Sequence, residues 1–225
     1  MGVSATAPSA ALLAQWTARE QRLHDRGGWV YLPDEASAVP SGACGIAGLR
    51  TQPPRENGGN LDVKQITRGA RLVLPVYVDG ALFSTGDAHF AQGDGEVCVT
   101  AIEMGATVTV RFRVHKGLAE RRAFDAPVFH HETSGAGTEL AGPQRFTAVT
   151  GMPISDDGEN DGENLTLAAR NAVLNMMELL VERGYSREQA YVICSVAVDL
   201  RVGNVVDAPN FVVTAILPEL IFDAG

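Results

Sequence analysis

The sequence predicts an α+β fold with a β-rich core, a C-terminal helix pair and two closing strands. Short apolar runs separated by turn residues fill most of residues 61–151, as they do in a sheet. Apolar residues then recur at helical spacing over residues 164–183, and a capping box at Ser186 opens a second helix. Two further strand-like runs, at residues 195–206 and 211–218, close the chain.

The first of three predicted portions, residues 1–28, is built around one helix. Residues 1–8 are small and polar, and we expect them to be loose. Ser9 can cap a helix, and the pair Gly27-Gly28 can end it.

The second portion, residues 29–150, is the predicted β-rich core. Its first part is rich in proline and glycine, and only residues 28–33 there read as a short strand. Pro75 places the next run at a sheet edge, because proline cannot donate to the ladder. Strand-like runs cover residues 71–78, 81–84, 97–103, 126–132 and 145–151.

The clearest strand pattern lies at residues 107–115. Val108, Val110, Phe112 and Val114 alternate with polar or charged residues. Successive side chains of a strand point to opposite faces, so this pattern predicts a half-buried strand.

The third portion, residues 151–225, carries the helix pair and the closing strands. Its acidic stretch at residues 155–163 has oxygen ligands but lacks EF-hand spacing, so we expect a solvated loop. The adjacent histidines His130 and His131 of the central portion would point to opposite faces of a strand, which disfavours one shared metal ion.

The composition is that of an ordinary globular chain. It has 225 residues, 45% of them hydrophobic and 20% charged, with a net charge of −9. This acidity argues against nucleic acid or an anionic membrane as a partner. The 3 cysteines lie far apart, no signal-peptide pattern is present, and no apolar run reaches the ~18 residues of a membrane span. We therefore expect a cytoplasmic chain with reduced thiols.

Side chains that suit catalysis or metal binding are concentrated in the stretch from Phe83 to Glu103. Acidic residues and one histidine recur there at two-residue spacing among glycines, which leave the backbone free to bend. Such a cluster suits a divalent metal ion or acid–base chemistry on a small polar substrate. The alternative is a solvated turn, since glycine and aspartate are ordinary turn residues. The residues concerned are Asp87, His89, Asp94, Glu96 and Glu103, with Gly86, Gly93 and Gly95 between them.

A second polar stretch, residues 53–64, permits two interpretations. Polar side chains surround Gly58-Gly59, which is typical of a hairpin turn. The same arrangement would let a backbone loop approach a ligand closely.

Several well-known catalytic motifs are absent from the sequence: a GxSxG elbow, a P-loop and an HExxH helix. Cys98 would share a strand face with Glu96 as a conceivable nucleophile pair. No histidine is assigned to activate it, so we expect a buried structural thiol.

Several segments of the sequence together resemble the acetamidase/formamidase family. The resemblance rests on PPRENGGNLDVK, RGARLVLPVYVDGALFSTGDAHFAQGDGE and AIEMGATV, and it continues through TLAARNAVLNMMELLVERGYSREQAYVICSVA and NVVDAPNFVVTAILPELIF. It implies a β-rich, sandwich-like core and the hydrolysis of formamide or acetamide to the acid and ammonia. It also implies a small amide substrate, self-association into a homo-oligomer, and a link to metal ions, with no organic cofactor.

The resemblance also implies roles for individual residues. Asp87 and His89 are the candidate metal ligands, with zinc the first choice and calcium the second. The candidate catalytic residues are Glu96, Asp94, Asp62 and Asn60, and the candidate substrate-binding residues are Gln92, Glu103, Gly93 and Gly95.

One departure from the family concerns its N-terminal portion. Family members carry a substantial segment before the helix that begins here near Ser9. The alternative function is therefore a non-catalytic or split-enzyme subunit, which needs a partner chain to complete its sheet and site. The segment SVAVDLRVGNVVDAPN, residues 195–210, also departs from the family's more glycine-rich pattern.

Overall fold

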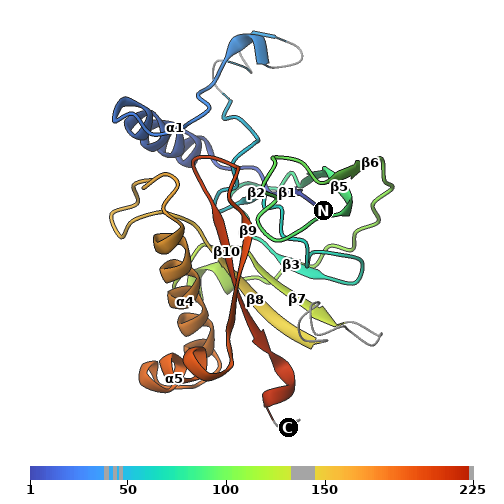
Figure 1. Ribbon diagram of the computed structural model, residues 1–225, viewed down its shortest axis with the longest axis vertical. Helices are drawn as coiled ribbons and strands as arrows, with labels where there is room; N and C mark the ends of the chain where they lie inside the picture. Colours follow the sequence, from blue (N-terminus) through green and yellow to red (C-terminus); the bar gives the residue numbers. More distant parts are fainter. Residues whose placement is uncertain (38–40, 43–44, 46–47, 133–144, 223–225) are drawn as a thin grey trace.

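The computed structural model describes residues 1–37, 41–42, 45, 48–132 and 145–222. Its largest sheet is antiparallel and five-stranded, in the order β3-β7-β8-β10-β9 (Figure 1). A three-stranded sheet of order β2-β1-β4 and the pair β5-β6 accompany it. The strands are β1 (Val3–Ala5), β2 (Gly58–Asn60), β3 (Arg71–Val73), β4 (Ser84–Gly86), β5 (Ala88–Ala91), β6 (Ile102–Met104), β7 (Val128–Glu132), β8 (Arg145–Gly151), β9 (Asp199–Asn204) and β10 (Val212–Pro218).

The helices gather at two places. Helices α4 (Leu165–Glu182) and α5 (Arg187–Ala197) lie along one face of the five-stranded sheet, and α1 (Ala10–Asp25) lies near the three-stranded sheet (Figure 1). The short helical turns are η1 (Glu35–Ser37), α3 (Leu118–Arg121) and η3 (Glu219–Ile221). No helix in these described ranges is long and apolar enough to cross a membrane. The predicted α+β fold, with its C-terminal helix pair and closing strands, is confirmed.

The five-stranded sheet separates two hydrophobic clusters. Val213, Ala215 and Leu217 of β10 pack against α4, whereas Val212 and Ile216 face the segment after β2. This is the alternation that a strand buried on both faces requires. The sheet draws strands from both residues 29–150 and 151–225, and the division into three portions stays a prediction.

Two buried ion pairs join α1 to the loop before β2. Arg19 donates to Glu56, and Arg55 donates to Glu20 through Nε–Oε1 at 2.7 Å and Nη2–Oε2 at 2.9 Å. The side chains of Arg19, Glu20 and Arg55 are all nearly inaccessible. A bidentate pair of this kind fixes orientation as well as distance. It therefore sets the course of the chain into Gly58–Asp62.

The predicted helix boundaries agree closely with the structure. The Ser9 side chain accepts from the Leu12 N–H at the start of α1, and Asn164 does the same for Leu167 in α4. The capping box at Ser186 and Gln189 opens α5. His130 and His131 contact different threonines, at Thr147 and Thr67, as their opposite directions predict. Strand β3 lies at the sheet edge, as Pro75 indicated.

Five predictions of local structure are wrong. Residues 28–33 form no strand, and residues 1–8 are not loose, because β1 is the central strand of its sheet. The runs 81–84 and 97–103 enter strands only at Ser84 and Ile102. Left-handed backbone at Ala81, Leu82 and Val99 (φ 56°, 45° and 67°) interrupts these two runs. Cys98 is exposed rather than buried.

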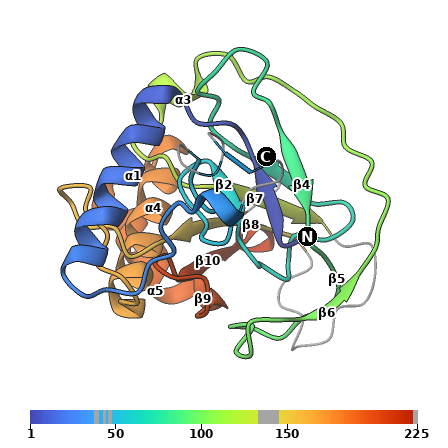
Figure 2. The ribbon, with the colours of Figure 1, turned by 90° about the horizontal axis from the view of Figure 1, so that it is seen from above.

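The predicted half-buried strand at residues 107–115 is also wrong for the described chain. These residues are extended but form no ladder with a described strand, and all of them are exposed. Figure 2 shows this stretch running from β6 around the outside of the molecule to α3. The alternating pattern is real, but no neighbouring strand in the described part of the chain covers it.

Candidate active site

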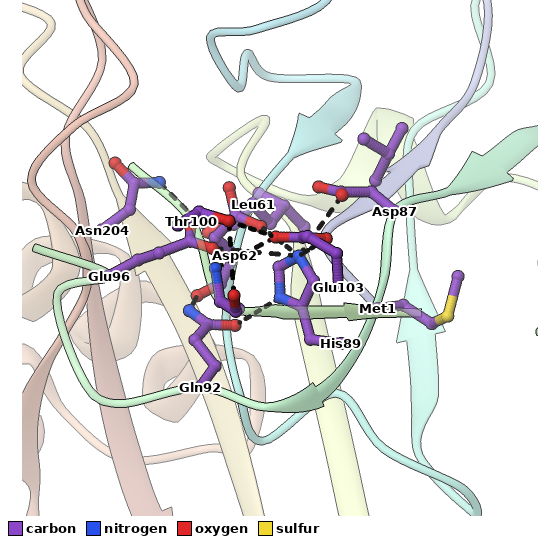
Figure 3. A network of polar contacts seen from close by, with 12 residues as sticks. Met1, Leu61, Asp62, Asp87, His89, Gln92, Glu96, Thr100, Glu103 and Asn204 are labelled. Carbon is purple, nitrogen blue, oxygen red and sulfur yellow. Dashed lines mark hydrogen bonds and ion pairs between the residues drawn. The ribbon is translucent and has the colours of Figure 1, made fainter. Parts of the chain in front are cut away.

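The candidate active site lies where several segments distant in sequence meet (Figure 3). Asp62 follows β2, whereas Asp87 and His89 stand at the start of β5. Glu103 on β6 is the cross-strand neighbour of His89, and Glu96 lies in the loop that joins the two strands. The structure thus brings together five titratable side chains from the two polar stretches of the sequence.

Gln92 determines which way the His89 ring points. The Gln92 Nε2 donates to the Asp62 carbonyl oxygen, so Oε1 of the same amide faces His89 Nδ1 at 3.0 Å. An amide oxygen only accepts, so Nδ1 carries the proton and donates it. In the neutral ring, Nε2 therefore presents a lone pair to the other side.

Four carboxylates surround that nitrogen. His89 Nε2 lies 3.2 Å from Glu103 Oε2, 3.3 Å from Asp87 Oδ1, 3.8 Å from Glu96 Oε1 and 3.9 Å from Asp62 Oδ1. Neither His89 Nε2 nor Asp62 Oδ1 has a hydrogen-bond partner among the residues that the structure describes, although both atoms are buried. A lone pair among carboxylate oxygens is unfavourable, so this point requires a cation, either a proton or a metal ion.

The side-chain chemistry fits a divalent metal ion. Two groups have ligand atoms mutually within 4.8 Å: Asp62, His89 and Glu96, which is the more buried, and Asp87, His89 and Glu103, which is the more exposed. Imidazole nitrogen and carboxylate oxygen are normal zinc ligands. The hydrogen bond from Nδ1 to Gln92 is the outer-shell contact that commonly orients a histidine ligand.

Hydrogen bonds also hold Glu103 in place. Its Oε1 accepts from the Thr100 hydroxyl at 3.1 Å and from the Ala101 N–H at 3.0 Å, which leaves Oε2 facing His89. Burial acts to raise the pKa of Glu103, but these two donors and the His89 charge outweigh it and lower that pKa. Glu103 is therefore a carboxylate at neutral pH.

The deeper carboxyl groups behave in the opposite way. Burial, together with hydrogen bonding to Asp207, raises the pKa of Asp62 to about 8. Burial and the Asp62 charge raise the pKa of Glu96 to about 7. Burial acts to lower the pKa of His89, but the Gln92 hydrogen bond and the nearby carboxylates raise it overall. The metal-free site thus holds protons near neutral pH, and a cation can replace them.

The sequence matches the Acetamidase/Formamidase family over residues 1–224.
The chain belongs to this family.
It is similar to the acetamidase of Mycolicibacterium smegmatis, with 39% identity over 208 residues that cover 85% of this chain and 50% of that protein. It is also similar to the formamidase of Methylophilus methylotrophus, with 34% identity over 237 residues, 99% of this chain and 57% of that protein. The structure of a gamma lactamase from Delftia acidovorans has a TM-score of 0.52 and 34% identity, covering 99% of this chain and 57% of that chain. This acetamidase/formamidase chain thus spans about half the length of the relatives it matches.

Asp207 belongs to the cluster but is not among the site residues that the sequence predicts. Asp207 is 3% exposed, interacts with the Asn60 and Asp62 side chains, and leaves Oδ2 without a hydrogen-bond partner. Burial raises the pKa of Asp207 to about 6. The motif NVVDAPN contains this residue and was part of the resemblance. The signal in the sequence that could have identified it is an aspartate placed directly after the apolar pair Val205-Val206.

Residues 202–205, just before Asp207, hydrogen-bond to both polar loops. The Asn204 side chain donates to the Leu61 carbonyl oxygen at 3.2 Å, and the Val205 N–H donates to the Gly95 carbonyl oxygen at 3.1 Å. The Gly95 N–H in turn donates to carbonyl oxygens at Val202 and Gly203. Gly95 needs its positive φ of 90° for this approach. Its amide is therefore occupied within the protein.

The other sequence-predicted residues lie at various distances from the cluster. Asp94 is paired with Lys64 and Arg201, each at 3.0 Å, and is not among the carboxylates around His89. Asn60 contacts Asp207 rather than the His89 ring. Gly93 faces open space, since a Cβ there would meet nothing within 4 Å.

The backbone around the site is unusual. Asp62, Asp87 and Glu96 all have left-handed backbone, with φ of 46°, 57° and 43°. Such conformations cost about 1–3 kcal/mol each for residues with a side chain, and they cluster at functional sites. Gly2 lies against the cluster, because a Cβ there would be 2.2 Å from Asp87 Oδ2 and 2.5 Å from Asp62 Oδ1.

Proposed function

We propose that this chain hydrolyses short linear amides, such as formamide and acetamide, to the carboxylic acid and ammonia at the cluster around His89. The observation that carries the proposal is the unpartnered His89 Nε2 facing four carboxylates in a chain of the Acetamidase/Formamidase family. The acetamidase and formamidase relatives support linear amides as substrates. The similarity to a gamma lactamase adds a cyclic amide to the substrates worth testing.

A divalent ion, zinc first and calcium second, would be held by His89, Asp87 and Glu103. Two atoms that bind one tetrahedral zinc ion at about 2.0–2.2 Å lie roughly 3.3–3.6 Å apart. The Asp87 and Glu103 oxygens, at 3.3 and 3.2 Å from His89 Nε2, are close to that spacing, and Glu96 and Asp62 are farther away. When bound, such an ion supplies Lewis-acid polarisation of the amide carbonyl and acidification of water.

The remaining carboxyl groups carry the proton transfers. Glu96 lies 3.8 Å from His89 Nε2 and its side chain is only 6% exposed, so it can accept the proton of the attacking water. As the water oxygen bonds to the carbonyl carbon and the C–N bond breaks, Glu96 returns that proton to the leaving nitrogen. Asp62 and Asn60 hold Asp207 behind this group, and Asp94 anchors the Gly93–Glu96 loop through Lys64 and Arg201.

The direct test is ammonia release by the purified chain from formamide, acetamide and a γ-lactam, with and without added zinc. We expect zinc-dependent release that Asp87→Ala abolishes while the far-ultraviolet circular dichroism spectrum is unchanged. Asp156→Ala, on the exposed loop near α4, is the matched control and should behave as wild type. A folded chain that binds zinc and releases no ammonia would contradict hydrolysis by this chain alone.

A second candidate function is that of a subunit, which needs a partner chain to complete its sheet and site. Two observations favour it: the chain spans about half the length of these relatives, and no described strand covers its strand-like residues 107–115. Inactivity of the chain alone, with activity restored by the remaining part of a relative, would establish this function. A homo-oligomer that is active without any addition would favour the first candidate.

A further inference from the structure

The segment from Ile102 to His115 has the sequence of a long amphipathic strand. Every even-numbered residue is apolar, and the odd-numbered residues after Gly105 are threonine, arginine or histidine. This period of two is the pattern of a strand with one buried face and one polar face. The apolar side chains are Ile102, Met104, Ala106, Val108, Val110, Phe112 and Val114.

The described part of the chain leaves that apolar face uncovered. Phe112 is 68% exposed and Val114 is 79% exposed, and every residue from 102 to 116 is exposed. Among the described strands, only the first three residues of the segment pair, as β6 with β5. Phe112 has one aromatic neighbour, Phe83, at 5.4 Å between ring centroids. A strand with free backbone groups and an exposed apolar face is a template for another strand.

We infer that residues 105–115 are the docking strand for a partner polypeptide, namely the part of the acetamidase/formamidase fold that this chain does not span. The partner would add a strand along this segment and cover its apolar face, the mode called β-augmentation. This inference rests on the second candidate function above and not on amide hydrolysis. About half of each matched relative has no counterpart in this chain. The unmatched half of such a relative is therefore the polypeptide that we expect to bind.

The charges of the segment specify the chemistry of that partner. Arg111, Arg113, His115 and Lys116 lie on or beside the polar face, and no acidic residue occurs between Glu103 and Glu120. The partner strand should therefore alternate apolar residues with carboxylates. A second copy of this chain would bring the same cationic face, and like charges opposite one another destabilise a strand pair.

Residues 105–115 begin next to the cluster around His89, so a partner bound to them would lie near that cluster. The segment continues directly from Glu103, whose side chain is 48% exposed, and the Asp87 side chain is 35% exposed on the same side of His89. These two exposed carboxylates thus lie on or beside the β5-β6 pair, from which the segment departs (Figure 2). A partner on residues 105–115 would stand beside these carboxylates and limit access of water.

The test mixes the purified chain with the recombinant part of the Methylophilus methylotrophus formamidase that it does not match. We expect a 1:1 complex by size-exclusion chromatography with light scattering. Hydrogen exchange of the amides of residues 107–115 should slow by at least about 100-fold in that complex, because strand pairing protects them. Val110→Glu should weaken the complex at least about tenfold, whereas Val196→Glu on α5, where the valine is 76% exposed, should not.

Three results would overturn the inference. They are the absence of a complex, a complex in which residues 107–115 exchange as fast as in the free chain, and a dimer of the free chain that Val110→Glu dissociates. Zinc titration of the free chain separates this inference from the proposed function. If the chain binds zinc but no partner, only the docking strand is contradicted. If it binds the partner but no zinc, only the metal site is contradicted.

Discussion

Gln92 accepts a hydrogen bond from His89 Nδ1 at 3.0 Å while its own amide nitrogen donates to the Asp62 carbonyl oxygen. One side chain thus fixes the histidine tautomer and ties it to the loop after β2. The opposite ring nitrogen is left among four carboxylates, where only a cation satisfies it.

Gln92→Leu should therefore weaken metal binding without unfolding the chain. Loss of an outer-shell partner typically costs about 10–100-fold in metal affinity, and we expect a loss in that range for zinc. Isothermal titration measures it. Gln21→Leu, on the exposed face of α1, is the control. Unchanged zinc affinity in the Gln92 variant would show that His89 needs no such orientation.

Gly2 should prove essential to the shape of the cluster. An alanine Cβ at this position would overlap the Asp87 and Asp62 carboxylates, at 2.2 and 2.5 Å. We expect Gly2→Ala to lower zinc affinity at least about tenfold, since overpacking forces side chains out of place. Gly86→Ala on the neighbouring strand β4 meets nothing within 4 Å and should be neutral. Equal zinc affinity for both variants would contradict this view of Gly2.

The metal-free protein should lose stability as pH rises. The pKa values of Asp62, Glu96 and Asp207 are raised to about 8, 7 and 6, whereas unfolded carboxyls titrate near 4. Between about pH 4 and 8 the folded chain binds more protons than the unfolded chain, so the free energy of unfolding falls with pH. Urea unfolding in the presence of a chelator should show the free energy of unfolding falling continuously over this window, and Asp62→Asn should remove much of the fall. A flat or rising profile would rule out buried, protonated carboxyls.

The Arg55–Glu20 pair should contribute strongly to stability. Both side chains are buried, so Glu20→Gln leaves the Arg55 charge without its partner. The expected loss in the free energy of unfolding is about 3–5 kcal/mol. Glu178→Gln breaks an exposed pair with Arg187 and should cost no more than about 1 kcal/mol. Similar urea midpoints for the two variants would show that the loop before β2 is held in another way.

Sequence reasoning succeeded where local rules decide the outcome. Helix caps at Ser9 and Ser186 and the apolar stripe of α4 are local signals, and the structure follows them. The two-residue spacing of Asp87 and His89 indicated a converging cluster, and both lie in it. The resemblance supplied Asp62, which joins them from a distant part of the chain.

Sequence reasoning failed where contacts between distant parts of the chain decide the position of a residue. Asp94 has the same spacing to Glu96 as Asp87 has to His89, but Lys64 and Arg201 draw it away. Asp207 reaches the site only because β9 ends beside Gly95 and Leu61. Residues 107–115 show that an alternating pattern predicts a strand but does not supply the neighbour that buries it.

In the proposed reaction, Glu96 moves the proton while His89, Asp87 and Glu103 would hold the metal ion. The most direct measurement compares zinc binding and ammonia release in wild type and Glu96→Gln under the conditions that give wild-type activity. We expect zinc affinity within about threefold of wild type and ammonia release reduced by roughly 10²–10⁴-fold, the usual contribution of a general acid–base group. A Glu96→Gln protein that releases ammonia at the wild-type rate would contradict the account.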